Sequence, residues 1–297
     1  MPSSQAAEAP ERGPTNWSRR RARRLGYPGW FTYVVLAVAT LLSVFPFYWM
    51  FVVASNDNSV VNAIPPALVP GPNFPARIKT ILDQFPFDRA FLNSFVVAGA
   101  IATSIAFLCP LAGYAFAKMR FRGRNLLFAL TVGTMMIPSQ LSVVPLFMEM
   151  SRLGWIDTLL ALIAPSMVTA FGVFWMRQYI EGAIHDEVLA AARVDGASSF
   201  QTFRMIVFPI IRPGAAVLGL FAFMDAWNDF LWPSIALNSP ENFTVQLALR
   251  QIERQAYAVD YGLALAGSLM ATLPLLLLFV LLGRQIVAGI MEGAVKG

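Results

Sequence analysis

Six long stretches of apolar, almost uncharged residues limit what this chain can fold into. Five contain no Asp, Glu, Lys or Arg, and the sixth contains only Asp225 and Asp229. A helix needs about 20 mostly apolar residues to cross the hydrocarbon core of a membrane. We therefore predict an all-α, polytopic membrane protein with six transmembrane helices, at about residues 30–53, 91–117, 126–148, 158–176, 213–237 and 261–283.

The composition supports this prediction and excludes other classes. Hydrophobic residues make up 57% of the chain and charged residues only 13%, whereas an ordinary soluble domain has about 25% charged residues. A transmembrane β-barrel would show short alternating segments in place of continuous apolar runs. The single Cys109 and single His185 exclude an internal disulfide and a zinc site built from several such ligands. We therefore expect no metal site.

The basic residues predict the orientation. With the N-terminus inside, 16 of the 22 Lys and Arg fall on the cytoplasmic side, as the positive-inside rule requires. Both termini are then cytoplasmic. We expect residues 1–28 to be a basic, disordered segment that contacts anionic lipid and not nucleic acid, and residues 29–297 to form the membrane domain. The first apolar stretch is long enough to be retained as a spanning helix.

Two outer loops have contrasting patterns. Residues 56–88 contain five prolines between positions 65 and 75, which predicts an irregular cap without regular helix. Residues 238–260 carry apolar residues at Val245, Leu247, Leu249 and Ile252. This spacing predicts a short helix that lies on the protein.

The cytoplasmic segment of about residues 177–212 is the most informative part of the chain. An alanine-rich helix should begin at Asp186 and Glu187, end at Gly196, and be followed by a second helix that Ser198 caps and that ends before Pro209. Its small side chains leave a shallow surface that another protein could approach closely. An amphipathic hairpin on lipid is the alternative, but it would need basic residues beside large apolar ones.

Polar residues within the apolar stretches are the candidates for a translocation pathway. Asp225, Asn228 and Asp229 are spaced to share one face of a helix, and ionisable groups at membrane depth usually face a bundle interior or a cavity. Asp229 could instead lie near the outer end, solvated or bonded to a neighbouring helix. Gln140 and Asn93 are further candidates. Trp227 and Trp232 could stack on sugar rings, although anchoring at the membrane interface is the favoured interpretation.

The cytoplasmic segment resembles the EAA loop of ABC-importer permeases, in its carbohydrate-uptake form. The resemblance covers about residues 30–297, and is closest to the second, six-span permease of maltose-type importers. Its motifs are Met136-Ile137-Pro138, Val144-Pro145-Leu146-Phe147, Leu153-Gly154-Trp155-Ile156-Asp157-Thr158, Phe208-Pro209-Ile210-Ile211-Arg212-Pro213, Trp227-Asn228-Asp229-Phe230-Leu231-Trp232-Pro233 and Gly289-Ile290-Met291-Glu292-Gly293-Ala294-Val295-Lys296-Gly297. Where the family usually has Glu before two alanines, this chain has Ala190 and therefore lacks that carboxylate.

The resemblance implies a six-helix ABC-importer permease of the type I fold in the cytoplasmic membrane. It implies that the loop seats in a separate ATPase subunit through Glu187, Ala191, Ala192, Asp195, Gly196 and Ala197. The implied partners are a second permease in a heterodimer, two ATPase subunits that bind ATP and Mg, an extracytoplasmic substrate-binding protein and membrane lipid.

Three functions remain to be compared. No Lys follows a Gly, so the chain lacks the phosphate-binding loop of an ATPase, and we expect no catalysis and no cofactor bound by this chain. The resemblance favours ATP-driven uptake of a di- or oligosaccharide, with a glycerol-phosphate or polyol-like solute as the alternative. A proton-coupled secondary transporter that uses Asp225 and Asp229 is a further alternative, but no inverted repeat is visible.

Overall fold

The computed structural model describes residues 29–255 and 260–294, and the regular structure within these ranges is entirely helical. The chain forms two compact units, Met1–Met50 and Phe51–Gly297. The first unit holds most of helix α2 (Trp30–Ser55), whose sequence is apolar and uncharged. The predicted basic segment 1–28 lies outside the described residues.

The second unit contains the end of α2 and the remaining helices. In chain order these are η1 (Asn58–Asn62), α3 (Phe74–Gln84), α4 (Phe87–Lys118), α5 (Arg124–Thr134), η2 (Ser139–Ser142), α6 (Val143–Arg152), α7 (Leu160–Ile163), η3 (Ala164–Ser166), α8 (Ala170–Ala183), α9 (Asp186–Val194), α10 (Ser199–Thr202), η4 (Phe203–Val207), α11 (Phe208–Asn228), α12 (Leu231–Ala236), η5 (Pro240–Asn242), α13 (Val245–Gln255) and α14 (Tyr261–Ala294).

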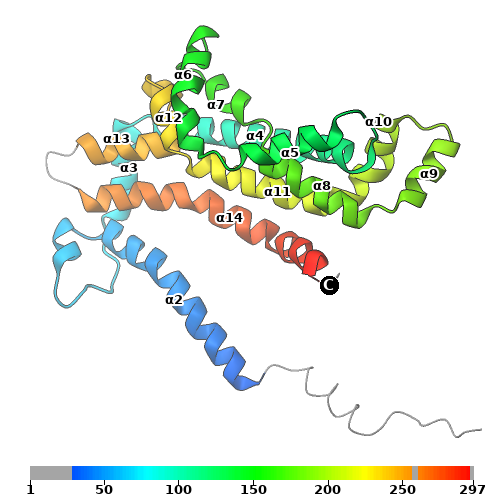
Figure 1. Cartoon of the computed structure of the whole chain (residues 1–297). Coiled ribbons are helices and arrows are strands. Elements are labelled where there is room, and N and C mark those ends of the chain that lie inside the picture. The colour runs from blue at the N-terminus through cyan, green and yellow to red at the C-terminus, as the bar shows by residue number, and fades with distance from the viewer. Residues whose placement is uncertain (1–28, 256–259, 295–297) are drawn as a thin grey trace, which may run out of the picture. The chain divides into compact units, whose positions relative to one another are not determined.

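Helix α4 is the centre of this unit and packs against both α8 and α11 (Figure 1). Glycines permit the close approach of α4 and α8. A Cβ atom on Gly113 would lie 2.8 Å from the backbone nitrogen of Arg177, and one on Gly172 would lie 2.7 Å from Cys109 Sγ. Small residues at such crossings let membrane helices gain van der Waals contact, which is a main source of their association.

Different helices form the two ends of this bundle. Helices α3 and α13 lie at one end and α9 with α10 at the other (Figure 1). A buried cluster that includes Phe87, Trp227 and Ile252 joins α4, α11 and α13. A second cluster, which includes Met176, Leu189 and Phe203, continues from the bundle into α9 and η4. The segment around α9 is therefore packed as part of the fold.

Within the described residues, five helical segments are long and apolar enough to cross a membrane, and a sixth is present if one bent pair is a single span. The bent pair corresponds to the predicted third span, 126–148. Residues 124–134 and 139–152 meet at an angle of 96°, so this stretch is sharply bent. Pro138 lies at the break and has no N–H to donate to the preceding turn, which explains why the helix does not continue.

The predicted fifth span, 213–237, has different bounds. A helical segment runs from Ser199 to Asn228, and the chain turns at Asp229 before the separate helix α12. Pro209 does not end the preceding helix. The residues before it form the π turn η4, and Pro209 occupies the first turn of α11, where a missing N–H is tolerated.

The structure confirms the prediction for one of the two outer loops and contradicts the prediction for the other. The expectation that residues 56–88 contain no regular helix is wrong, because α3 begins within them with Pro75 in its first turn, where proline is favoured. The helix predicted in residues 238–260 is confirmed as α13. Its Val245, Leu247 and Ile252 are buried.

Candidate functional site

Two adjoining cavities lie where α11 meets the segment between α6 and α8. The larger has a volume of about 690 Å³ and the other about 610 Å³, which is the size range of small-molecule sites. Val97, Ile101 and Leu218 line part of the larger cavity. Asp225, Asn228, Asp229, Trp232, Pro165 and Ser166 line both cavities.

The three polar residues predicted to share one face do come together here. Asp225 and Asn228 are on the last turns of α11, and Asp229 follows directly after its end. The Asn228 amide donates to the Met224 carbonyl oxygen at 2.7 Å, and backbone N–H groups at the start of α12, that of Trp232 among them, hydrogen-bond the Asp229 carboxylate. Among the described residues no hydrogen bond or ion pair engages Asp225, which leaves its carboxylate available to a ligand.

The two weaker candidates lie in different places. Gln140 is exposed and lines the second cavity together with Asp225 and Asn228. Asn93 does not line either cavity. Its side-chain amide donates to the carbonyl oxygens of Glu241 and Phe243 at 2.8 and 3.0 Å, so it ties helix α4 to the loop before α13.

The two tryptophans in this region are buried, and the favoured interpretation of them as interface anchors is wrong. Trp227 is 1% exposed, and its indole N–H donates to the Ala271 carbonyl oxygen at 3.1 Å. Trp232 is 9% exposed and donates to the Ala161 carbonyl oxygen at 2.9 Å. A buried indole usually satisfies its one donor in this way.

Helix α9 is the first half of the loop that the sequence singled out. Its acidic residues Asp186 and Glu187 occupy the first turn, where the helix dipole favours negative charge. Leu189 and Ala192 are buried, whereas Glu187, Ala191 and Asp195 are exposed. The helix therefore attaches by one face and presents the other.

Gly196 ends α9 as predicted, with φ at 79° in the left-handed region. The N–H of Ala197 donates to the Ala192 carbonyl oxygen at 3.0 Å, and that of Gly196 donates to the Arg193 carbonyl oxygen at 3.1 Å. This pair of bonds is the Schellman motif, which usually requires glycine at this position. The small, sharply turned end exposes Val194, of which 88% is accessible.

Ser198 caps the next helix, as its position predicts. Its hydroxyl accepts from the N–H of Gln201, and the Gln201 side chain accepts from the N–H of Ser198, a reciprocal arrangement that fixes a helix N-terminus. The loop is also held to the end of α4, because Lys118 Nζ lies 2.7 Å from Asp186 Oδ1. Lys118 is chiefly responsible for lowering the pKa of the exposed Asp186 carboxyl.

Comparison with known families identifies this architecture. Residues 109–288 match the model of the family described as "Binding-protein-dependent transport system inner membrane component". The chain belongs to this family. It is therefore the multi-pass inner-membrane permease component of a binding-protein-dependent transport system, and its role in transport is not catalytic.

Curated relatives of the permease cover most of its length. The lactose transport system permease protein LacG of Rhizobium radiobacter is 35% identical over 89% of this chain and 95% of that protein. The arabinooligosaccharides transport system permease protein AraQ of Halalkalibacterium halodurans is 35% identical over 70% of this chain and 74% of that protein. The sn-glycerol-3-phosphate transport system permease protein UgpE of Yersinia enterocolitica is 31% identical over 88% of this chain and 95% of that protein.

A solved structure has the same fold as the permease. It is a crystal structure of a bacterial ABC transporter involved in the import of the acidic polysaccharide alginate. The TM-score is 0.73 at 20% sequence identity, and the match covers 92% of the permease and 99% of the other chain. The six-helix ABC-importer permease fold predicted from the resemblance is thus confirmed as a fold, with the bent pair as its sixth possible span.

Sequence reasoning missed Asp157, which holds the end of α12 and the loop after it in place. The N–H groups of Asn238 and Ser239 each donate to Asp157 Oδ1 at 2.9 Å, and the Ser239 hydroxyl donates to Oδ2. These bonds lower the pKa of the Asp157 carboxyl to about 2, with the Ser239 hydroxyl as the largest cause. Asp157 has φ at 62°, a conformation that Asp adopts more readily than most residues, but the sequence alone does not indicate its partners.

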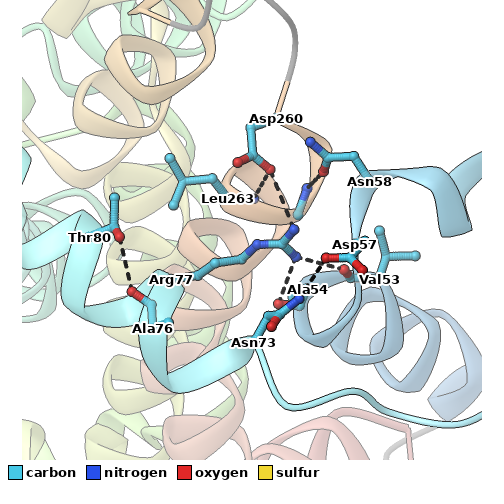
Figure 2. Close-up of polar contacts among 11 residues, drawn as sticks. Val53, Ala54, Asp57, Asn58, Asn73, Ala76, Arg77, Thr80, Asp260 and Leu263 are labelled. Atoms are coloured by element: carbon cyan, nitrogen blue, oxygen red, sulfur yellow. Dashed lines mark hydrogen bonds and ion pairs between the residues drawn. The ribbon is translucent and has the colours of Figure 1, made fainter.

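A second missed residue is Arg77, at the α3 end of the permease. Figure 2 shows its guanidinium between the end of α2 and the start of α14. Arg77 Nη1 donates to the carbonyl oxygens of Val53 and Ala54, both at 3.0 Å, and Nη2 lies 3.7 Å from Asp260 Oδ1. Terminal helix carbonyls lack partners within the helix, and a cation there also complements the helix dipole. Arg77 therefore joins three helix ends.

Proposed function

We propose that this permease is a membrane subunit of an ATP-driven ABC importer and that its cargo is a neutral di- or oligosaccharide. Relatives named for lactose and for arabinooligosaccharides support the sugar class. The relative named for sn-glycerol 3-phosphate keeps the anionic alternative open. The observation that favours the sugar is the pair of carboxylates, Asp225 and Asp229, at the lining of the two cavities.

The physical argument rests on charge. A carboxylate accepts hydrogen bonds from sugar hydroxyls, and bonds to a charged group contribute about 1.5 to 3 kcal/mol each. A phosphate at about 6 Å from one carboxylate would instead be repelled by about 3 kcal/mol at an effective dielectric constant near 20. That energy corresponds to a disadvantage of about 100-fold. Asp225, which has no partner among the described residues, is the carboxylate that we expect to meet the cargo.

Uptake into proteoliposomes that contain the complete transporter tests this assignment. We expect uptake of a neutral oligosaccharide and none of sn-glycerol 3-phosphate. The Asp225→Asn variant should lower the sugar uptake rate by about tenfold, because the remaining hydrogen bond is to a neutral group. Asp83→Asn removes an equal charge from an exposed position on α3 and should not change uptake. Normal uptake by Asp225→Asn would refute the role of this carboxylate.

The proposed partners are a second permease, two ATPase subunits that bind ATP and Mg, and an extracytoplasmic binding protein. We propose that the exposed face of α9 and its turn, with Glu187, Ala191, Asp195, Gly196 and Ala197, docks on an ATPase subunit, while the buried Ala192 fixes α9 to the permease. Lys118 and the reciprocal cap of Ser198 support this docking role, because they hold the loop as a rigid body that can transmit a displacement.

Two glycines permit a matched test of the docking surface. Gly196 and Gly123 have φ of 79° and 80°, and a Cβ on either would meet no atom within 4 Å. Alanine at each position should therefore cost a similar 1 to 2 kcal/mol in backbone strain. Only Gly196→Ala should reduce co-purification of the ATPase and ATP-dependent uptake, whereas Gly196→Asn should retain most of both because Asn tolerates this conformation. Equal losses for Gly196→Ala and Gly123→Ala would contradict the proposal.

The proton-coupled alternative has its own test. Collapse of the proton gradient in vesicles supplied with ATP should leave sugar uptake intact if the transporter is ATP-driven. Loss of uptake under those conditions, with ATP still present, would instead support a proton relay through Asp225 and Asp229.

A further inference from the structure

A third cavity, distant from Asp225, lies between the end of α4 and the loop that contains α9. Its volume is about 320 Å³. It is lined by Tyr114, Lys118, Met119, Arg120, Leu189, Arg193, Ala197, Ser199 and Thr202. Its walls therefore come from α4, from α9 and from the first turn of α10, three elements that the bundle brings together.

The lining is strongly basic. Lys118, Arg120 and Arg193 contribute three positive charges, and the lining contains no carboxylate. The side chain of Lys118 is only 11% exposed, and its partner Asp186 stands outside the cavity with 84% of its side chain exposed. After Lys118, the charges of Arg193 and Arg120 also lower the pKa of the Asp186 carboxyl. One acidic group thus faces three cations, which leaves an uncompensated positive field.

The remaining lining combines hydroxyl and apolar groups. Tyr114, Ser199 and Thr202 supply hydroxyls, which together with the cations can hydrogen-bond phosphate oxygens. Met119, which lines the cavity, and Phe121, two residues later in the chain, are exposed by 36% and 41%. A polar, cationic pocket beside exposed apolar side chains matches the junction between the headgroup and the acyl chain of a phospholipid.

We propose that this cavity binds the phosphate of an anionic phospholipid headgroup from the cytoplasmic leaflet. Basic pockets between helices on the cytoplasmic side of a membrane protein attract such headgroups, and free phosphate would leave Met119 and Phe121 uncovered. A headgroup in this position contacts α4, α9 and α10 together and shares Lys118 with Asp186. The lipid would thereby fix the loop relative to the membrane-spanning helix. The assignment of the lipid to the cytoplasmic leaflet rests on the proposed orientation of the chain. Lipid binding itself does not depend on which cargo the permease carries.

Native mass spectrometry of the full-length protein with its co-purifying subunits tests the site. After partial delipidation, the sample is titrated with dioleoylphosphatidylglycerol or with dioleoylphosphatidylcholine, and the ratio of their affinities is measured. Each of Arg193→Gln and Arg120→Gln should lower the preference for phosphatidylglycerol about fivefold, the equivalent of about 1 kcal/mol for a basic residue near an anionic surface. Both residues are exposed, so neither substitution should disturb folding, and Arg193→Lys should restore the preference.

Arg122→Gln is the matched control, because Arg122 lies in the same segment but does not line the cavity. Its effect should stay below twofold, and 10 mM inorganic phosphate should leave the phosphatidylglycerol preference unchanged. An equal loss in Arg122→Gln would show attraction to the basic surface in general and would overturn the proposal. Displacement of the lipid by inorganic phosphate would reassign the cavity to the free anion, and an unchanged preference in Arg193→Gln and Arg120→Gln would remove the site.

Discussion

The guanidinium of Arg77 occupies the position where a side chain at Gly262 would begin. A Cβ atom built on Gly262 would lie 1.7 Å from Arg77 Nη1 and 1.9 Å from Cζ. No relaxation of a few tenths of an ångström accommodates such an overlap, so the Gly262→Ala variant must expel the guanidinium from its site. We therefore predict that Gly262→Ala has nearly the same effect on stability as the removal of the Arg77 side chain.

The contacts of Arg77 give the magnitude. Its two hydrogen bonds to the Val53 and Ala54 carbonyl oxygens contribute at least about 1.5 kcal/mol each, since the donor is charged. The ion pair with Asp260 spans 3.7 Å, and the Asp260 side chain is 38% exposed, so it contributes well under 1 kcal/mol. Arg77→Ala and Gly262→Ala should each lower the free energy of unfolding by about 3 kcal/mol.

A double-mutant cycle separates this explanation from two independent defects. The double variant Arg77→Ala/Gly262→Ala should also lose about 3 kcal/mol, because the second substitution finds no guanidinium to displace. The measurement is reversible unfolding in mixed micelles titrated with SDS, followed by circular dichroism. Arg89→Ala removes an exposed cation and serves as the control, with a change within about 0.5 kcal/mol. Additive losses of about 6 kcal/mol in the double variant would refute the reasoning.

Three further predictions concern side chains whose hydrogen bonds join separate helices and loops. Asp157→Asn should lower the free energy of unfolding by about 1 to 2 kcal/mol at neutral pH after allowance for solvent screening, measured by the same unfolding titration. Because folding lowers the pKa of Asp157 to about 2, the stabilisation by its carboxylate is present above about pH 4 and is lost as the pH falls toward 2. An Asp157→Asn variant that kept the same acid dependence would argue against this role of Asp157. Asn93→Ala should cost about 1 to 3 kcal/mol through its two hydrogen bonds, and hydrogen exchange should be faster around Phe243 and unchanged in α9. Trp227→Phe removes the bond to the Ala271 carbonyl oxygen and the five-membered ring of a fully buried indole, so it should cost about 2 to 4 kcal/mol in thermal unfolding, and a loss below about 1 kcal/mol would argue against both contributions.

The sequence predicted the helices of the membrane bundle because their length and lack of charge are local properties. It also predicted the turn at Gly196 and the cap at Ser198, because Schellman and capping-box geometry depend on a few adjacent residues. The size of the bend near Pro138 was not predicted, because it is not a local property. A proline within an apolar stretch indicates a kink but does not determine its angle, so only the packed structure fixes the bend of 96°.

The candidate site was predicted in part. The spacing of Asp225, Asn228 and Asp229 predicted a common helix face, and the three residues line the same two cavities. The sequence did not indicate that Asp229 lies beyond the end of α11 and receives N–H groups from the start of α12. Gln140 reaches the same cavity only because the chain bends before it. Asn93 was a reasonable candidate by composition, yet its amide is engaged by carbonyl oxygens about 150 positions later in the chain, a pairing that no local pattern contains.

The helical segment from Ser199 to Asn228 has a geometric consequence for the whole permease. It comprises 30 residues, which at 1.5 Å per residue correspond to a lever of about 45 Å. One end follows directly after the turn at Gly196, and the other carries Asp225 and Asn228. A tilt of about 5° pivoted at the first end would displace the second by about 4 Å, which is about three quarters of the pitch of an α-helix. A small angular change of this segment can therefore alter which atoms the two acidic cavities present.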